Sequence, residues 1–220
     1  MDYDQKSSDY YSNIRKDLID FLGSSNKQLK VLEIGAAYGS TLFELKKQGI
    51  ANEIVGIDLF EDKANKDRYC KLDRFIFGDI ENLDFPEFAS YFDLILLPDV
   101  LEHLSEPQLV LKKVSNYLKK EGQIVVSMPN IRHYTSIKKI FFQGDFAYEE
   151  SGIFDYTHKR FYCRKNISDL IDKSGFKVIK QEGSIKNYTG KSIAKIINKL
   201  TFGVFVEFLS TQYYFLSVKK

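Results

Sequence analysis

Three carboxylates stand where a short apolar run of the sequence ends and a turn begins. Glu33 closes the run 29–34, and Asp58 and Asp79 hold the corresponding places in two later runs. A carboxylate accepts hydrogen bonds from the hydroxyls of a ribose, from an amine or from an ammonium group. The turn after Glu33, Gly35-Ala36-Ala37-Tyr38-Gly39, is rich in small residues that let a ligand approach the backbone. This pattern predicts a site for a nucleotide-like ligand.

The apolar runs alternate along the chain with segments of helical periodicity. We expect strands at 29–34, 53–59, 74–80, 92–97, 123–128, 176–181 and 212–218. We expect helices at 9–22, 40–49, 105–121, 132–142, 166–174 and in the first part of 190–209. This alternation predicts an α/β fold with a doubly wound, Rossmann-like and mostly parallel seven-stranded sheet. Ligands bind at the carboxyl ends of the strands in such sheets, where the three carboxylates lie.

Two helices carry start signals. Ser40 or Thr41 is expected to cap the helix at 40–49, and Gly49 follows as its stop. The segment Ser105-Glu106-Pro107-Gln108 has the pattern of a capping box that opens the next helix.

No internal repeat, linker or low-complexity tract divides the sequence, so we expect residues 1–220 to form a single domain. The alternation of strands and helices breaks at about 130–165, in a segment dense in aromatic and charged residues. A long irregular insertion in a compact domain is usually functional. We therefore expect this segment to form a lid over a second substrate.

The composition is that of an ordinary globular chain, with 44% hydrophobic and 28% charged residues. No apolar run approaches the roughly 20 residues that cross a bilayer. The first residues lack the pattern of a signal peptide, and Cys70 and Cys163 are too few for a disulfide framework or a zinc site. We expect a cytoplasmic protein.

The net charge of +2 hides an uneven distribution of charge along the chain. Residues 1–150 carry 19 Lys/Arg and 25 Asp/Glu, a balance of −6, whereas residues 151–220 carry 13 and 5, a balance of +8. The basic segment either forms solvated helix faces or attracts an anionic substrate or membrane surface. We expect no nucleic-acid partner, because general nucleic-acid binding usually requires a more strongly basic domain.

The glycine spacing distinguishes two classes of cofactor. A dinucleotide fingerprint, G-x-G-x-x-G, would place its second and third glycines at Ala37 and Ser40. The observed pattern is E-x-G-x-A-x-G, with glycines four residues apart and an acidic residue at the strand end. This spacing argues against NAD, so an NAD oxidoreductase is the least favoured function.

The segment Glu33-Ile34-Gly35-Ala36-Ala37-Tyr38-Gly39 resembles the first motif of class I S-adenosylmethionine-dependent methyltransferases, with Ala37 in place of the middle glycine. Asp58, the pair Asp79-Ile80 and the segment FDLILLPDVLEHLSEP resemble later motifs of that family. The resemblance implies S-adenosylmethionine as cofactor and S-adenosylhomocysteine as product. It implies that Glu33 holds the methionine ammonium, Asp58 the ribose diol and Asp79 the adenine amine. The implied cofactor-binding residues are Glu33, Gly35, Ala36, Ala37, Gly39, Asp58, Leu59, Asp79, Ile80, Pro98 and Asp99.

The segment from Pro129 onward is similar to the second half of methyltransferases encoded among bacterial surface-polysaccharide genes. It contains Pro129-Asn130 and then Asp155-Tyr156-Thr157-His158-Lys159-Arg160-Phe161 before a helix. The similarity implies a sugar or glycan-type acceptor that is methylated on a hydroxyl or an amine. It implies that the insertion at 130–165 is an acceptor-binding lid. The candidate acceptor-binding residues are Asn130, Tyr134, Asp155, Tyr156 and Arg160.

His158 is the candidate catalytic residue, either as a general base or to orient the acceptor, because histidine titrates near neutral pH. A structural histidine that bonds its own loop is the alternative. Two other functions stay open: a quinone- or phenol-type O-methyltransferase, and a non-catalytic S-adenosylmethionine-binding protein.

Two further features suggest partners. Asp99-Val100-Leu101-Glu102-His103, with His158 as a distant ligand, resembles a metal motif of some methyltransferases whose first position is Glu. We expect no metal, because Asp stands at that position and the Glu-His pair also occurs in metal-free members. Segment 190–209, apolar and carrying Lys191, Lys195 and Lys199, is a candidate contact for a membrane surface or a lipid-linked acceptor. The oligomeric state is open.

Overall fold

A computed structural model describes residues 13–23, 28–62, 66–187 and 193–220 of the chain. Its centre is one seven-stranded sheet with the strand order β3-β2-β1-β4-β5-β7-β6. Every pairing is parallel except those of β7, which runs antiparallel to β5 and β6. The strands are β1 (Leu29–Ile34), β2 (Ala51–Asp58), β3 (Arg74–Phe77), β4 (Phe92–Pro98), β5 (Leu118–Pro129), β6 (Phe176–Gly183) and β7 (Gln212–Lys219). The prediction of a mostly parallel seven-stranded sheet is confirmed.

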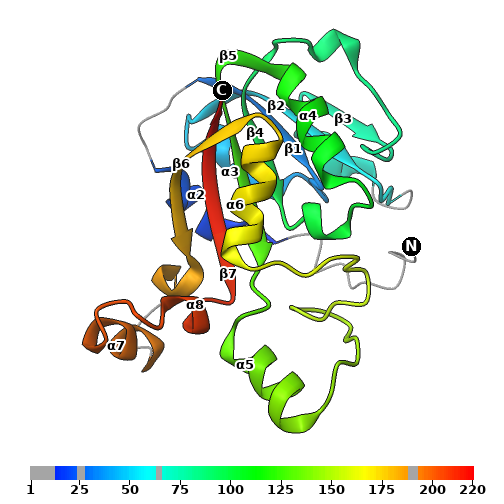
Figure 1. The fold of residues 1–220 in the computed structure, drawn as a ribbon. Helices are drawn as coiled ribbons and strands as arrows, with labels where there is room; N and C mark the ends of the chain where they lie inside the picture. Colours follow the sequence, from blue (N-terminus) through cyan, green and yellow to red (C-terminus); the bar gives the residue numbers. More distant parts are fainter. Residues whose placement is uncertain (1–12, 24–27, 63–65, 188–192) are drawn as a thin grey trace.

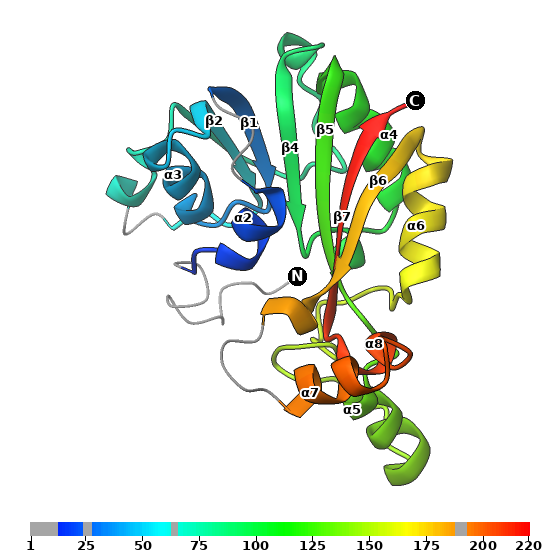
Figure 2. The same ribbon diagram turned by 90° about the vertical axis from the view of Figure 1, so that its left-hand side faces the viewer.

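Helices cover both faces of this sheet. The pair α2 (Lys16–Leu22) and α3 (Ser40–Lys47) lies on one face, and α4 (Pro107–Tyr117) and α6 (Arg164–Lys173) lie on the other (Figures 1 and 2). The expected helix at 9–22 begins at Lys16, and its positions 9–12 lie outside the described residues. Short single turns connect the larger elements: η2 (Lys66–Tyr69), η3 (Pro86–Phe88), η4 (Leu101–His103) and η6 (Ser184–Asn187).

The core consists of two apolar layers that the sheet separates. Alternate residues of a strand point to opposite faces, so Leu32 and Ile34 of β1 belong to the layer under α4 and α6. Val31 of the same strand packs on the other side, with Leu18 of α2 and Leu42 of α3. Because the central strands are buried on both faces, they appear in the sequence as continuous apolar runs.

Two helix starts differ from the expectation. The residue before α3 is Gly39, in the left-handed conformation with φ 71°, and no side chain caps the helix. The helix α4 begins at Pro107, whose fixed φ suits the first helical position, and Glu106 precedes it without a capping bond. The side chain of Ser105 instead accepts a hydrogen bond from Lys159 Nζ at 2.6 Å. The Ser40/Thr41 cap and the capping box are therefore wrong.

The insertion at 130–165 is mostly irregular. Its helical part is α5 (Tyr134–Ile137), which continues as the wider turn η5 (Lys138–Phe142). The helices α7 (Ile193–Leu200) and α8 (Val206–Leu209) lie at the same end of the sheet as α5 (Figures 1 and 2). Among the described residues, no helix combines the length and the apolar character that crossing a membrane requires.

Candidate functional site

A cavity of about 940 Å³ opens at the carboxyl ends of β1, β2 and β4 and at the turn after β3. This volume is in the range of small-molecule and cofactor sites. Ten of the eleven candidate cofactor residues line it: Glu33, Gly35, Ala36, Ala37, Asp58, Leu59, Asp79, Ile80, Pro98 and Asp99. The eleventh, Gly39, is not among the lining residues and instead provides the left-handed turn that starts α3.

The turn after β1 requires small residues for a measurable reason. A Cβ on Gly35, which has φ 73°, would lie 2.8 Å from Cγ2 of Val100. Ala37 also has a positive φ, 49°, a conformation that favours glycine. The departure from the family pattern at this position therefore places a side chain on strained backbone, and the methyl group is small enough to be accommodated.

Asp58 ties the end of β2 to this turn. One carboxylate oxygen accepts a hydrogen bond from the backbone N–H of Ala37 at 2.7 Å, and the other accepts one from Phe60 at 2.8 Å. Burial raises the pKa of Asp58, and these hydrogen bonds oppose that effect. Asp58 thus both clamps the turn and presents acceptor oxygens at the cavity.

Glu33 is a buried carboxyl at the floor of the cavity. Its side chain is 2% exposed, and Oε2 has no hydrogen-bond partner within the described part of the chain. Burial raises its pKa to about 8, Arg15 acts in the opposite direction, and Asp58 adds to the increase. A buried carboxyl without a full set of partners suits a ligand that brings a donor or a positive charge.

Asp99 follows β4 and is held by residues from distant parts of the chain. Arg15 donates to it at 2.6 Å, Ser127 at 3.0 Å, and Gln212 also donates to it. Arg15 and Gln212 line the cavity, and sequence reasoning missed both. Neither belongs to a local motif, so no signal in the sequence identifies them.

Asp79 lies on the opposite side of the cavity, after β3. Its carboxylate accepts hydrogen bonds from the backbone of Glu81 at 2.8 Å and from the side chain of Asn82 at 2.7 Å. These contacts form the turn and leave Asp79 and Ile80 among the lining residues. Glu81 also lines the cavity and was missed, together with Lys159, which reaches it from the lid at 3.8 Å.

The candidate acceptor residues frame the lid, and none of the five is among the described residues that line the cavity. Asn130 is buried, and its amide donates to the carbonyls of Glu207 and Ser210. Asp155 is buried and accepts hydrogen bonds from the backbone and hydroxyl of Thr157. The other three are Tyr134 and Tyr156, which are exposed, and Arg160, which donates to the carbonyl of Ser105.

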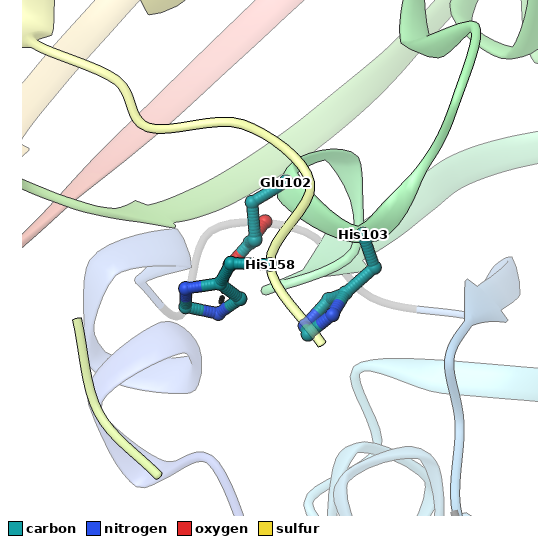
Figure 3. Close-up of side chains that lie close together, drawn as sticks. All are labelled: Glu102, His103 and His158. Carbon is teal, nitrogen blue, oxygen red and sulfur yellow. Dashed lines mark ion pairs between the residues drawn. The ribbon is translucent and has the colours of Figure 1, made fainter. Parts of the chain in front are cut away.

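Two backbone hydrogen bonds bring the lid to the turn η4. The N–H groups of Lys159 and Arg160 both donate to the carbonyl of Glu102, at 2.9 and 3.2 Å. This contact places His158 beside Glu102 and His103 (Figure 3), with the two imidazole rings 4.7 Å apart. His103 lines the cavity, whereas His158 lies behind it and is 6% exposed.

Backbone carbonyls set the tautomer of each ring. Nδ1 of His158 lies 2.9 Å from the carbonyl of Ile153. Nδ1 of His103 lies 3.2 Å from the carbonyl of Thr157 and 3.0 Å from its hydroxyl, which donates its own proton to Asp155. A carbonyl only accepts, so each Nδ1 carries the proton and each Nε2 is the basic nitrogen in the neutral ring. Nε2 of His158 is 3.9 Å from a carboxylate oxygen of Glu102.

Glu102 is the third member of this cluster and is fully buried. Burial, together with the nearby charge of Asp99, raises its pKa well above the ordinary range. One ligand atom from each of Glu102, His103 and His158 lies within 4.8 Å of the others, so the cluster has the donor types and spacing for a metal ion.

Comparison with known proteins gives concordant results. The model of a family described as a methyltransferase domain matches residues 7–181. The chain is 22% identical over 172 residues to the mitochondrial ubiquinone biosynthesis O-methyltransferase of Dictyostelium discoideum, a match that covers 72% of this chain. The match spans only about half of that relative, 53% of its length.

Solved structures share the fold. An S-adenosylmethionine-dependent methyltransferase from Mesorhizobium loti superposes with a TM-score of 0.65 at 15% identity, over 93% of this chain and 96% of that one. A second, from Archaeoglobus fulgidus, gives a TM-score of 0.61 at 20% identity, over 93% and 92% of the two chains.

Proposed function

This chain belongs to the methyltransferase domain family, and from that premise we propose that it methylates a sugar or glycan-type acceptor on a hydroxyl or an amine. It is an S-adenosylmethionine-dependent methyltransferase, so the class of reaction follows from the family. One observation carries the residue assignments: the carboxylates at the carboxyl ends of β1 and β2 and in the turn after β3 converge on a single cavity that His103 of η4 and Lys159 of the lid also line.

In this proposal each of the three carboxylates binds a different part of the cofactor. Glu33 binds the methionine ammonium, since it is a buried carboxyl that lines the cavity and has one oxygen without a hydrogen-bond partner among the described residues. Asp58 accepts hydrogen bonds from the ribose diol, and Asp79 accepts one from the adenine amine. The small turn residues 35–37 leave room for the methionine part.

The acceptor approaches from the side of His103, with His158 as the proposed catalytic residue behind it. Methyl transfer is an in-line displacement: a bond forms from the acceptor atom to the methyl carbon as the bond from that carbon to sulfur breaks. Positioning of the two partners can contribute about 7–11 kcal/mol to such a step. His158 then orients or activates the acceptor atom, and His103 is its neighbour on the cavity wall.

A quinone- or phenol-type acceptor is the second candidate, because the Dictyostelium relative is named as a ubiquinone biosynthesis O-methyltransferase. The two candidates differ in polarity. A sugar nucleotide carries phosphates that suit Lys159 at the cavity and the basic segment 151–220, whereas a quinol would need an apolar wall.

The end of the molecule beside the lid supports a lipid-linked glycan as the form of the acceptor. Exposed apolar side chains gather there on α7 and around it, such as Leu200 at 73% and Phe202 at 95% exposure, and Lys195 and Lys199 lie in the same segment. An amphipathic helix with these features binds anionic membrane surfaces. In this proposal the enzyme acts on the cytoplasmic face of a membrane, in surface-polysaccharide synthesis.

Vesicle co-sedimentation tests the membrane part. We expect binding to vesicles with phosphatidylserine, weaker binding to phosphatidylcholine alone, and a loss of about tenfold for Phe202→Ser, the order expected when a large apolar contact is removed. Leu109→Ser is the control, because Leu109 is an exposed apolar residue (59%) that lies on α4, away from this surface. Equal binding by both variants would argue against this surface.

The acceptor class is tested by measuring S-adenosylhomocysteine release from S-adenosylmethionine with three panels of acceptors: sugar nucleotides, lipid-linked sugars, and quinols or catechols. Acceptor-dependent turnover with a sugar panel supports the proposal. Turnover only with the quinol or catechol panel would assign the second candidate instead.

A further inference from the structure

The carboxyl of Glu102 is buried without the partners that a buried carboxyl normally has. Its exposure is 0%, and neither carboxylate oxygen has a hydrogen-bond partner within the residues that the structure describes. An isolated buried polar group costs about 1–3 kcal/mol, and more if it is charged. Buried carboxylates are retained when they pair with a charge or coordinate a metal.

The two histidines beside it are arranged as metal-binding histidines are. In such sites the ring nitrogen that does not bind the metal donates to a backbone carbonyl or a carboxylate, which fixes the ring and its tautomer. The carbonyls of Ile153 and Thr157 hold Nδ1 of His158 and His103 in this way. Both bonds come from the lid, so docking of the lid on η4 orients both rings.

The structure also changes which residues make up the candidate ligand set. The motif in the sequence begins with Asp99, but Asp99 is engaged by Arg15 at 2.6 Å and by Ser127 at 3.0 Å. The donors that come together are instead Glu102, His103 and His158 (Figure 3). A set of one carboxylate and two imidazoles suits Zn²⁺ and related ions, whereas Mg²⁺ prefers oxygen ligands and water.

We propose that Glu102, His103 and His158 bind a divalent transition-metal ion of the Zn²⁺ type, with an open coordination position on the cavity side of His103. Ligands at about 2.0–2.1 Å from a tetrahedral ion lie roughly 3.3 Å apart. The pair His158 Nε2 and Glu102 Oε1 is already at 3.9 Å, and the three donor atoms lie within 4.8 Å of one another. Small side-chain rotations therefore close the site.

The part of the ion in the reaction rests on the proposed function, whereas its binding does not. Three protein ligands with an open position are typical of catalytic rather than structural zinc. An ion held by these residues would supply a Lewis acid that makes it easier for an acceptor hydroxyl to lose its proton to solvent. The oxygen of this hydroxyl then forms the bond to the methyl carbon, and the electron pair of the breaking carbon–sulfur bond converts the sulfonium to a neutral thioether.

Metal binding is measured directly on the full chain after chelator treatment. We expect one equivalent of Zn²⁺ by calorimetry, and a visible ligand-field spectrum with Co²⁺ that Zn²⁺ abolishes. His158→Ala and Glu102→Gln should each weaken Zn²⁺ binding by more than about 100-fold, because loss of an outer-shell partner alone costs 10–100-fold. His133→Ala is the matched control, because His133 is a buried histidine whose Nδ1 lies within hydrogen-bond distance of the Thr135 hydroxyl, outside the proposed ligand set. The His133→Ala variant should bind Zn²⁺ as the wild type does.

Binding of S-adenosylhomocysteine shows that each variant is folded and separates the two proposals. Wild-type protein that binds S-adenosylhomocysteine but neither Zn²⁺ nor Co²⁺ would overturn the metal site and leave the methyltransferase intact. Unchanged Zn²⁺ binding in both His158→Ala and Glu102→Gln would also overturn it, since the ion would then be bound elsewhere. If a variant fails to bind S-adenosylhomocysteine, His103→Asn replaces it in the comparison.

Discussion

The proposed cofactor half and the proposed acceptor half of the molecule hold their polar groups in different ways. Around the cavity, Glu33 is the last residue but one of β1, Asp58 ends β2 and Asp99 follows β4, and the parallel sheet brings them together. On the acceptor side, His158 stands on an irregular loop, where a carbonyl of the lid and the turn η4 hold it. The first arrangement is set by strand pairing, the second by the docking of one loop.

This difference predicts that a substitution in one half impairs the function of that half and leaves the function of the other half intact. A change at a strand end should affect cofactor binding, because the sheet keeps the rest of the site in place. A change in the lid should affect the methyl-transfer step and leave cofactor binding intact. Four substitutions or conditions test this division, in order of decreasing expected effect.

Asp58→Ala should strongly weaken cofactor binding. Two hydrogen bonds to a charged group contribute about 1.5–3 kcal/mol each, so the Kd for S-adenosylhomocysteine should rise by about 10²–10⁴-fold. Calorimetry measures the Kd, and the thermal unfolding midpoint shows whether the protein stays folded. Asp58→Asn, which keeps an oxygen for the Ala37 N–H, is the conservative control. If the Asp58→Ala protein is unfolded and the Asp58→Asn protein binds S-adenosylhomocysteine normally, Asp58 only stabilises the turn and does not bind the cofactor.

His158→Ala should slow methyl transfer and leave cofactor binding almost unchanged. Removal of the residue proposed to orient or activate the acceptor, directly or as a metal ligand, is expected to lower kcat by at least about 10²-fold. The Kd for S-adenosylhomocysteine should stay within about threefold, because His158 is not among the residues that line the cavity in the described part of the chain. Steady-state kinetics beside His133→Ala provide the measurement. Normal turnover would reject His158 as a catalytic residue.

The pH dependence of cofactor binding sharpens the description of the cofactor half. The pKa of Glu33 is about 8 in the unliganded protein, so Glu33 is protonated at pH 6. An ammonium ligand favours the carboxylate, so binding must release a proton below pH 8. The affinity for S-adenosylhomocysteine should therefore rise between pH 6 and pH 8, by up to about tenfold per pH unit. Calorimetry in buffers of different ionisation enthalpy measures how many protons are released on binding. An affinity that does not change with pH, without proton release, would show that Glu33 does not bind the ammonium group.

Ala37→Gly should have the smallest effect. Glycine adopts the positive φ of 49° without strain, which should stabilise the folded state by about 1–2 kcal/mol. The greater conformational freedom of glycine in the unfolded chain offsets part of this stabilisation. We expect the free energy of unfolding to increase by about 0.5–1 kcal/mol in urea titrations. A decrease would show that the alanine methyl group packs favourably in the turn.

The same contrast explains how much the sequence could predict. The seven strands, and the ten candidate cofactor residues that line the cavity, lie in local sequence motifs, because a buried strand and the residues after it are contiguous in sequence. Arg15 and Gln212 were not predicted, since they reach Asp99 from segments whose own sequence carries no sign of it.

The acceptor side was predicted less completely, because its contacts join residues far apart in the chain. His103 and Thr157 are 54 positions apart, and only the docked lid brings them together. The sequence makes the histidine of the Asp-x-Thr-His segment, His158, a catalytic candidate, but it does not show that His103 rather than His158 lines the cavity. The capping predictions were wrong because Gly39 and Pro107 start their helices through backbone geometry and need no side-chain cap.

A calorimetric titration of the purified wild-type chain with S-adenosylhomocysteine, with NAD in a parallel experiment, tests the central claim most directly. The account predicts one binding site for S-adenosylhomocysteine, an affinity that increases with pH up to about 8, and no binding of NAD. A folded protein that does not bind S-adenosylhomocysteine, or that binds NAD in its place, would contradict the assignment of this cavity.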